Sequence, residues 1–210
     1  MLRAVNDTFV LHADESWIVV DKPAGLPAVP GRTPELQDCA ATRVQAIYPD
    51  ALVVHRLDMA TSGLLLFARG VAVQRTLGHA FERRRIHKHY IAVVHGQPTG
   101  DEGTIDLPLA ADWPNRPRQR VDGAHGKPAL SHWRVTERGV RGARLQLTPV
   151  TGRTHQLRVH LAAIGHPIQG DTLYAPPEPE APRLLLHASV LELVHPRSGE
   201  ATRFESPAPF

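Results

Sequence analysis

Residues 53–70, which read VVHRLDMATSGLLLFARG, place a carboxylate and basic side chains between two apolar runs. Asp58 can have two roles at this position. It can open a turn and accept local N–H bonds, or it can be a catalytic carboxylate held on a loop between two rigid strands. Arg56 lies two residues earlier, and in an extended segment its side chain would face the same side as Asp58.

A second polar segment, residues 148–160 (TPVTGRTHQLRVH), places Arg153 just before a predicted helix. An Arg about 4 Å from an ionised Asp is attracted by roughly 4 kcal/mol at an effective dielectric constant of about 20. Such an Arg would keep the carboxylate ionised in a partly buried pocket. Taken alone, Arg153 can equally be a surface or helix-capping residue, so the residues themselves leave both roles open.

The basic residues favour a polyanionic partner because they gather in clusters. The net charge is +3 and the pI is about 9.4, and three of the 24 basic residues are Lys while the rest are Arg. Codon bias in a GC-rich genome can explain the Arg excess, but guanidinium groups also match phosphate oxygens. The clusters lie at 81–90, 115–120 and 151–160, and the candidate phosphate-binding residues in the first two are Arg83, Arg84, Arg85, Lys88, Arg116, Arg118 and Arg120.

Several classes of site find no support in the sequence. It contains neither a dinucleotide-binding GxGxxG after a strand nor a P-loop, and no CxxC or HExxH pattern. The 13 histidines are not paired with carboxylates at ligand spacing, so no metal is expected. The single cysteine, Cys39, excludes an internal disulfide and indicates a reducing compartment. Residues 1–17 lack the apolar stretch of a signal peptide and no run is long enough to span a membrane, which predicts a cytoplasmic location.

The pattern of apolar residues predicts an α+β domain with a mixed, mostly antiparallel sheet and flanking helices. Helices are expected at 34–48, with Thr33 as N-cap, at 71–85 and at 154–165, where Gly165 ends the helix. Strands are expected at 15–23, 51–58, 63–70, 88–96, 103–109, 183–196 and 201–207, with a hairpin over 130–150. Because the composition marks no interior boundary, residues 1–210 are expected to form one domain.

Four ordered segments resemble the RluA family of pseudouridine synthases. They are IVVDKPAGLPAVPG at 18–31, HRLDMATSG at 55–63, KHYIAVVHG at 88–96 and TGRTHQLRVHLAAIGHPIQGD at 151–171. The resemblance extends from about Trp17 to the C-terminus. It implies the pseudouridine synthase fold with a catalytic cleft, and a single catalytic domain without the S4-like RNA-binding domain of some relatives. It also implies an isomerase that converts uridine in RNA to pseudouridine.

The same resemblance assigns roles to individual residues. Asp58 matches the essential carboxylate, Arg153 the arginine that pairs with it, and Tyr90 the active-site tyrosine that stacks on the uracil. Without the family, Tyr90 would be an ordinary strand aromatic packed in the core. Isomerisation needs neither a redox change nor an energy input, so no cofactor is implied.

The resemblance further predicts the partner and how it is bound. The target uridine must leave its stack, at a cost of a few kcal/mol, and phosphate contacts can offset that cost. His55 and Arg56 join the basic clusters as predicted RNA-contact residues. The implied substrates are a 23S rRNA hairpin and a tRNA anticodon stem-loop, and the protein is expected to act as a monomer.

Two other functions remain open on the residues alone. A non-catalytic RNA-binding module would explain the charge clusters but not a carboxylate with a dedicated Arg. A metal-dependent RNA hydrolase would use some of the histidines as ligands, and its activity would be lost in excess chelator.

Overall fold

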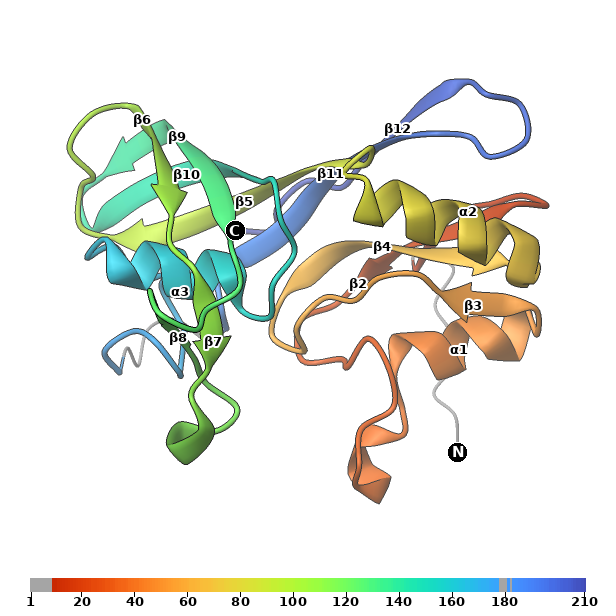
Figure 1. Cartoon of the computed structure of the whole chain (residues 1–210), viewed down its shortest axis with the longest axis horizontal. Coiled ribbons are helices and arrows are strands. Elements are labelled where there is room, and N and C mark those ends of the chain that lie inside the picture. Colours follow the sequence, from red (N-terminus) through yellow and green to blue (C-terminus); the bar gives the residue numbers. More distant parts are fainter. Residues whose placement is uncertain (1–8, 178–180, 182) are drawn as a thin grey trace. The chain divides into compact units, whose positions relative to one another are not determined.

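The computed structural model describes residues 9–177, 181 and 183–210 and contains two compact units (Figure 1). Unit 1 comprises the chain up to His87 together with Ala188–Pro209, and unit 2 comprises Lys88–His187 and Phe210. Each unit combines antiparallel strand pairs with helices, which confirms the α+β class. That residues 1–210 act as one catalytic domain stays a prediction.

In its described residues, unit 1 combines paired strands with two α-helices and one 3₁₀ helix. Its strands run in the order β1-β2-β4-β11, with β12 paired to β11 and β3 paired to β4. The pairs β1–β2, β2–β4, β3–β4 and β11–β12 are antiparallel. The elements are β1 (Val10–Ala13), β2 (Trp17–Lys22), the 3₁₀ helix η1 (Pro34–Leu36), α1 (Ala40–Ile47), β3 (Ala51–Val53), β4 (Ser62–Arg69), α2 (Gly70–Glu82), most of β11 (Leu186–Val194) and β12 (Ala201–Glu205).

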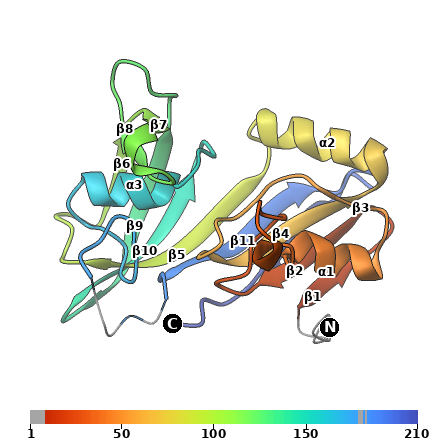
Figure 2. The ribbon, with the colours of Figure 1, turned by 90° about the horizontal axis from the view of Figure 1, so that it is seen from below.

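The core of unit 1 forms where α2 packs against the sheet (Figure 2). Val73 and Leu77, one helical turn apart, lie in one buried cluster with alternate residues of the strands, including Trp17 and Leu66. Gly63 opens β4 with a φ of 107°, and a Cβ atom there would lie 2.3 Å from the Ala188 carbonyl oxygen. Only glycine permits this close passage of β11 past the end of the 55–63 segment.

Unit 2 contains paired strands in the order β5-β10-β9-β6, together with a separate β7–β8 hairpin. Its strand pairs are antiparallel. The helix α3 packs near β8, and Val159 of α3 lies in a small core with Leu109 and Ala129. The elements are β5 (His87–His95), β6 (Glu102–Asp106), β7 (Leu109–Ala111), the 3₁₀ helix η2 (Trp113–Asn115), β8 (Gln119–Val121), β9 (Leu130–Gly139), β10 (Gly142–Pro149) and α3 (Gln156–Ala163).

The predicted helix over 34–48 is wrong in its extent. A short 3₁₀ turn, η1, is followed by a separate helix that starts at Ala40. Cys39 breaks the helix because its backbone is extended and its Sγ accepts the N–H of Thr42, while the Thr42 hydroxyl accepts the N–H of Cys39. This reciprocal pair is a capping box, with a thiol in place of the usual hydroxyl.

The predicted strand over 51–58 is too long, because β3 ends at Val53. Residues 54–61 form a loop, so Asp58 lies in an eight-residue connection rather than in a tight hairpin turn. The sequence pattern also missed the short strands β1, β7 and β8. The other strands and the helices α2 and α3 agree with the prediction within a few residues.

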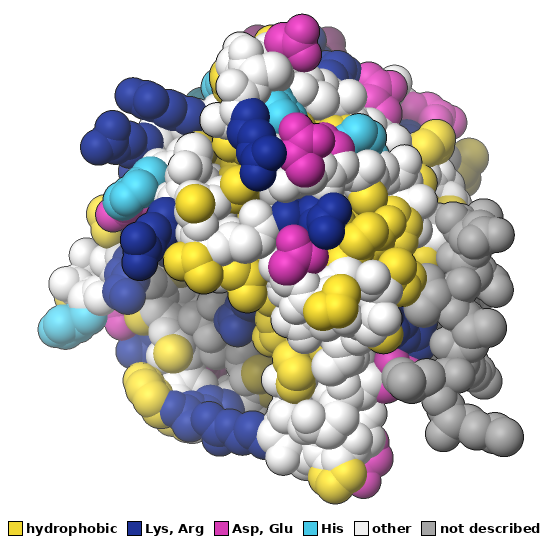
Figure 3. Space-filling model, turned by 90° about the vertical axis from the view of Figure 1, so that its right-hand side faces the viewer, with side chains coloured by type: hydrophobic (Ala, Val, Ile, Leu, Met, Phe, Trp, Pro, Cys, Tyr) yellow, Lys and Arg dark blue, Asp and Glu magenta, His cyan; other side chains and the backbone are white. Residues whose placement is uncertain are grey.

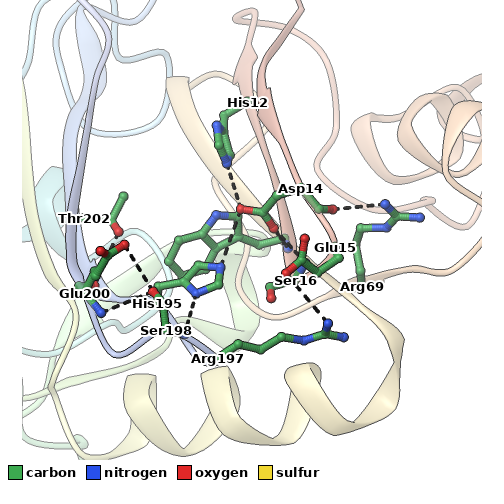
Figure 4. A network of polar contacts seen from close by, with 11 residues as sticks. His12, Asp14, Glu15, Ser16, Arg69, His195, Arg197, Ser198, Glu200 and Thr202 are labelled. Atoms are coloured by element: carbon green, nitrogen blue, oxygen red, sulfur yellow. Dashed lines mark hydrogen bonds and ion pairs between the residues drawn. The ribbon is translucent and has the colours of Figure 1, made fainter.

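A polar network joins the β1–β2 turn to the β11–β12 turn in unit 1 (Figure 4). The Asp14 carboxylate accepts N–H bonds from Ser16 and Trp17 and contacts the His12 ring at 2.9 Å and the His195 ring at 3.6 Å. Burial alone would raise the pKa of Asp14, but the hydrogen bonds from His12 and the two backbone N–H groups lower it below its ordinary value. The network therefore fixes these turns around an ionised carboxylate.

In the part of the chain that the structure describes, no helix is long and apolar enough to cross a membrane. The predicted absence of a signal peptide concerns a segment whose residues 1–8 lie outside the described residues.

Candidate active site

A buried lysine holds the loop that carries Asp58. Lys22, at the end of β2, is fully buried, and its Nζ donates to the carbonyl oxygens of Pro23 at 2.9 Å, Leu26 at 2.8 Å and Met59 at 3.1 Å. The Gly25 N–H also donates to the Met59 carbonyl, at 2.8 Å. A buried ammonium needs such partners to offset its desolvation. The Met59 carbonyl, next to Asp58 in the chain, is thus held by the Lys22 ammonium and the Gly25 N–H, and neither contact uses the Asp58 side chain.

The remainder of the 54–61 loop is also anchored. The Thr61 N–H donates to the Asp58 carbonyl oxygen at 3.1 Å, and Thr61 is buried. His55 accepts the Leu66 N–H on its Nε2 at 3.0 Å and stacks against Phe81, with ring centroids 4.7 Å apart. The contacts of the His55 ring therefore join β4 to α2. Its predicted contact with RNA stays a prediction, as does that of Arg56, which is exposed.

Unit 2 carries Tyr90 and Lys88 on β5. Tyr90 is half-buried and is paired in register with Leu147 of β10. Lys88, two residues earlier, shares its face of the strand. A Cβ atom placed on Gly152 would lie 3.8 Å from the Lys88 Nζ, so this side chain reaches the turn that carries Arg153. Lys88 is half-buried, whereas the arginines of the same cluster are exposed, and burial lowers the pKa of Lys88.

Gln156 fixes the backbone around Arg153. Its side-chain oxygen accepts the Thr151 hydroxyl at 2.7 Å and the Arg153 N–H at 3.0 Å, while its Nε2 donates to the Leu130 carbonyl and to the Ser131 hydroxyl. Arg153 itself is exposed, and its Nε donates to the Pro128 carbonyl at 3.1 Å. One buried amide at the start of α3 therefore joins the Arg153 turn to the beginning of β9.

A buried ion pair joins α3 to the segment that follows it. Arg158 makes two hydrogen bonds of 2.7 Å to the two oxygens of Asp171, and both side chains are at most 5% exposed. Asp171 also accepts the N–H groups of Leu173 and Tyr174. The Tyr174 hydroxyl accepts the Gln119 N–H and contacts the His155 Nδ1 at 2.7 Å, and burial raises its pKa. The ion pair thus supports the residues immediately after Arg153.

His160 extends this polar core, and its burial gives a prediction on pH. Its Nδ1 contacts the Ser131 hydroxyl and its Nε2 the Leu107 carbonyl, both at 3.0 Å. Desolvation lowers the pKa of His160 below its ordinary value of 6.5, so the unfolded chain binds the proton more tightly than the folded protein. We expect the free energy of unfolding to fall as the pH drops below about 6.5, by at most ~1.4 kcal/mol per pH unit from this group.

The measurement for His160 is chemical denaturation between pH 7.5 and 5.5. The His160→Gln variant serves as the reference because it removes the titrating group from the same position. A wild-type protein whose stability follows the same pH profile as His160→Gln would contradict the prediction.

The basic cluster of unit 1 is exposed and includes a residue in an unusual conformation. Arg83, Arg84 and Arg85 follow α2, and all three are exposed. Arg84 has a φ of 56°, and the N–H groups of Arg84 and Arg85 bond to the carbonyls of Phe81 and Ala80. This is a Schellman motif with arginine at the position that normally favours glycine. On the face seen in Figure 3, several Lys and Arg side chains lie on the left, and others lie nearer the centre and top beside acidic side chains.

The second basic cluster lies on the β7–β8 hairpin of unit 2. Arg116, Arg118 and Arg120 are exposed, but their neighbours differ. Arg116 stacks over the Trp113 ring, Arg118 lies over the Tyr174 ring and Arg120 forms an ion pair with Asp122 at 3.0 Å. The charge of Arg120 is therefore partly neutralised within the protein.

The structure separates the predicted catalytic residues between the two units. Asp58 belongs to unit 1, while Tyr90 and Arg153 belong to unit 2, so their mutual pairing stays a prediction. Among the described residues, no group of His, Cys, Asp or Glu has an arrangement that could hold a metal ion. Sequence reasoning missed Lys22, Gln156 and the Arg158–Asp171 pair. One signal for Lys22 was available, because it is one of three lysines and follows an apolar run.

Comparison with known proteins assigns the family. Residues 16–163, which include Asp58, Tyr90 and Arg153, match the family described as RNA pseudouridylate synthase. The dual-specificity RNA pseudouridine synthase RluA of Escherichia coli strain K12 is 50% identical over 204 residues, which cover 96% of this chain and 93% of the relative. The RluA protein of Pasteurella multocida strain Pm70 is 46% identical over the same shares of the two chains.

Solved structures agree with this assignment. Human RNA pseudouridylate synthase domain containing 1 is 28% identical and superposes with a TM-score of 0.78, over 96% of this chain and 83% of the human one. Human RNA pseudouridylate synthase domain containing 4, at 23% identity and a TM-score of 0.77, shares the fold. The predicted pseudouridine synthase fold is confirmed. The chain therefore belongs to the RNA pseudouridylate synthase family and is an isomerase.

Proposed function

We propose that this protein isomerises specific uridines in structured RNA loops, and that it serves both a 23S rRNA hairpin and a tRNA anticodon stem-loop. One observation carries the proposal: relatives 50% identical over 96% of the chain are dual-specificity RNA pseudouridine synthases. The absence of a required cofactor, a cytoplasmic location and a monomeric state complete the proposal. Loops are suitable targets because flipping a nucleotide there breaks fewer stacking and pairing contacts.

Asp58 is the essential carboxylate in this proposal. The N1–C1′ bond of uridine breaks, the uracil turns, C5 bonds to C1′, the C5 proton leaves and N1 gains a proton. The departing uracil spreads its own negative charge, so one carboxylate suffices where glycosidases commonly use two. Asp58 either attacks C1′ as a nucleophile or removes the 2′ proton. The anchored 54–61 loop supports this role because it presents the carboxylate from a fixed backbone.

Arg153 is the proposed partner that orients Asp58 and keeps it ionised. Two contacts within unit 2 hold Arg153 in place. Its backbone N–H donates to the Gln156 side-chain oxygen, and its Nε donates to the Pro128 carbonyl. A guanidinium anchored at its Nε still has its two terminal nitrogens to offer a carboxylate. This arrangement suits a residue that must meet a charged group at a fixed angle.

Tyr90 gives a prediction that separates stacking from proton transfer. If its hydroxyl helps to remove the C5 proton, Tyr90→Phe should bind RNA like the wild type while turnover falls about 10²- to 10⁴-fold. Binding and single-turnover rates measured on the same RNA test this. Full activity of Tyr90→Phe would reduce Tyr90 to a packing and stacking residue.

The exposed arginines supply the proposed phosphate contacts, and Arg84 permits a sharp test. A non-glycine residue in the left-handed conformation costs roughly 1 kcal/mol, and Arg84→Gly removes that cost. We therefore expect Arg84→Gly to raise the melting temperature by about 2–4 °C. We also expect weaker RNA binding. The plot of log binding constant against log salt concentration should become less steep, with a slope smaller by about 1.

Two further variants control the Arg84 test. Arg84→Asn removes the charge but tolerates the left-handed conformation, so it should weaken binding to a similar degree. Arg75→Gln removes a charge from the exposed side of α2, the helix that precedes Arg84, and should leave RNA affinity unchanged. Unaltered RNA affinity in both Arg84 variants would exclude a phosphate contact at this position.

Deletion of the gene tests the choice of substrate. We expect pseudouridine to disappear from one site in 23S rRNA and from the anticodon stem-loop of particular tRNAs, and to return with the wild-type gene. Loss in one RNA class alone would refute dual specificity. Loss in neither would refute the substrate assignment.

A further inference from the structure

The β7–β8 hairpin of unit 2 exposes an indole ring. Trp113 is 67% exposed, whereas Trp17 is buried at 1%. Among the described residues, Trp113 is the sole aromatic in the group of exposed large hydrophobic side chains. Single exposed apolar residues are common and need no explanation, so exposure alone does not indicate a site.

The arrangement around Trp113 is what distinguishes it. The Arg116 guanidinium lies over the Trp113 ring, 3.5 Å from its centroid. A planar cation stacked on an aromatic ring leaves a flat surface that matches the face of a nucleobase. The 67% exposure shows that most of the indole surface stays open to solvent even with Arg116 in place.

The backbone of the hairpin tip is fixed in advance of binding. The Asp112 N–H donates to the Arg118 carbonyl, the Arg118 N–H to the Asn115 carbonyl, and the Asn115 N–H to the Asp112 carbonyl, each at 3.0 Å. The Asn115 side-chain amide also donates to the Asp112 carboxylate at 3.0 Å. Two prolines, Pro114 and Pro117, further restrict the chain. A rigid tip loses little conformational entropy when it binds a ligand.

Positive charge surrounds the exposed ring. The guanidiniums of Arg116 and Arg118 contact aromatic rings and form no ion pair with another described residue. Arg120, by contrast, is paired with Asp122. The base of the hairpin is anchored because the Gln119 N–H donates to the Tyr174 hydroxyl, which in turn contacts His155 beside the Arg153 turn. Tyr174 thus contacts both the β7–β8 hairpin and the residues beside the Arg153 turn.

We propose that Trp113 and Arg116 form a stacking platform for one unpaired nucleobase of the substrate RNA, other than the uridine that is isomerised. Arg118 contacts a phosphate next to that base. The proposal rests on the proposed function, because it gives the same RNA loop a second recognised nucleotide. Stacking reads the presence and position of an unpaired base more than its identity, which suits a protein that accepts two different RNAs.

The test is a binding cycle that combines protein variants with abasic RNA. A stem-loop substrate is prepared with a single abasic nucleotide at each unpaired position outside the target uridine. Dissociation constants are measured for the wild type, Trp113→Ala and Trp113→Phe, with Val140→Ala as a control. Val140 is fully exposed in the β9–β10 turn of the same unit and has no role in the proposal.

The proposal predicts a specific pattern in these constants. Trp113→Ala should weaken binding of the intact stem-loop about 5- to 150-fold, the usual value of one stacked base, while Trp113→Phe retains most of the affinity. One abasic position should weaken wild-type binding by a similar factor and have no effect on Trp113→Ala. Tryptophan fluorescence should be quenched when intact RNA binds, and much of the quenching should be absent in Trp113→Phe.

Other outcomes overturn the proposal. If Trp113→Ala binds like the wild type, or if every abasic substitution weakens Trp113→Ala as much as the wild type, the ring does not stack on a base. A Trp113→Ala protein that self-associates less than the wild type, with unchanged RNA binding, would indicate that the ring contacts a second copy of the chain. The cycle measures RNA binding and not turnover. The stacking proposal can therefore be refuted while the protein still forms pseudouridine, so failure of this proposal is distinguishable from failure of the proposed function.

Discussion

We expect the Asp58→Asn protein to form no detectable pseudouridine while it binds RNA about as tightly as the wild type. The substitution keeps the shape of the side chain and removes its charge and nucleophilicity. The loop around it should remain in place, because Lys22, Gly25 and Thr61 hold it through main-chain atoms. Loss of the group that performs the chemistry commonly lowers turnover by about 10⁴-fold or more.

Three controls surround the Asp58 prediction. Asp58→Ala removes the carboxylate by another route and should be equally inactive. Asp50→Asn removes a carboxylate of the same unit that pairs with Arg69 at the surface, and it should retain turnover. Measurable activity of Asp58→Ala within tenfold of the wild type would contradict the proposed mechanism. Loss of RNA binding in Asp58→Asn would instead indicate a structural carboxylate.

The second large effect is expected at the Arg158–Asp171 pair. Asp171→Ala leaves a buried guanidinium without its carboxylate, which should lower the free energy of unfolding by about 3–5 kcal/mol. It also removes the acceptor for the N–H groups of Leu173 and Tyr174, so the Tyr174 contact with His155 should loosen. Denaturant unfolding measures the loss of stability.

A double variant separates charge from packing at this pair. Arg158→Met with Asp171→Leu replaces two charges by apolar groups and should recover much of the stability lost in Asp171→Ala, because neither charge is left buried alone. The matched surface pair, Arg43 and Asp38, should tolerate Asp38→Ala with less than about 1 kcal/mol of loss. A loss of less than about 1 kcal/mol in Asp171→Ala would show that water or another group replaces the carboxylate.

The regular elements were predictable where one apolar pattern dominated. The alternation in β9 and β10 and the helical spacing of Val73 and Leu77 reflect burial on one face, so the strands and α2 agree with the structure. The helix over 34–48 failed because Cys39 is an uncommon N-cap, and its role depends on the Thr42 hydroxyl rather than on any apolar period. The strand over 51–58 failed because its apolar residues continue past the point where the hydrogen-bonded ladder ends.

The candidate site was predictable only in part. The residues themselves indicated Asp58 and Arg153 as polar groups at the ends of apolar segments, whereas their proposed catalytic roles came from the family resemblance. Lys22 and Gln156 were missed because their importance lies in the main-chain atoms that they bind, and a sequence does not show which carbonyls meet a given side chain. Residues that hold a loop leave no periodic signal.

The most direct test of the central claim is conversion of RNA by the purified protein. Unmodified transcripts of 23S rRNA and of tRNA are incubated with the protein in excess chelator and without any added cofactor, and pseudouridine is mapped at nucleotide resolution. We predict stoichiometric pseudouridine at one loop uridine in each substrate, with none formed by Asp58→Asn. A wild-type protein that binds these RNAs but leaves every uridine unchanged, or that cleaves the RNA and stops in chelator, would contradict the account.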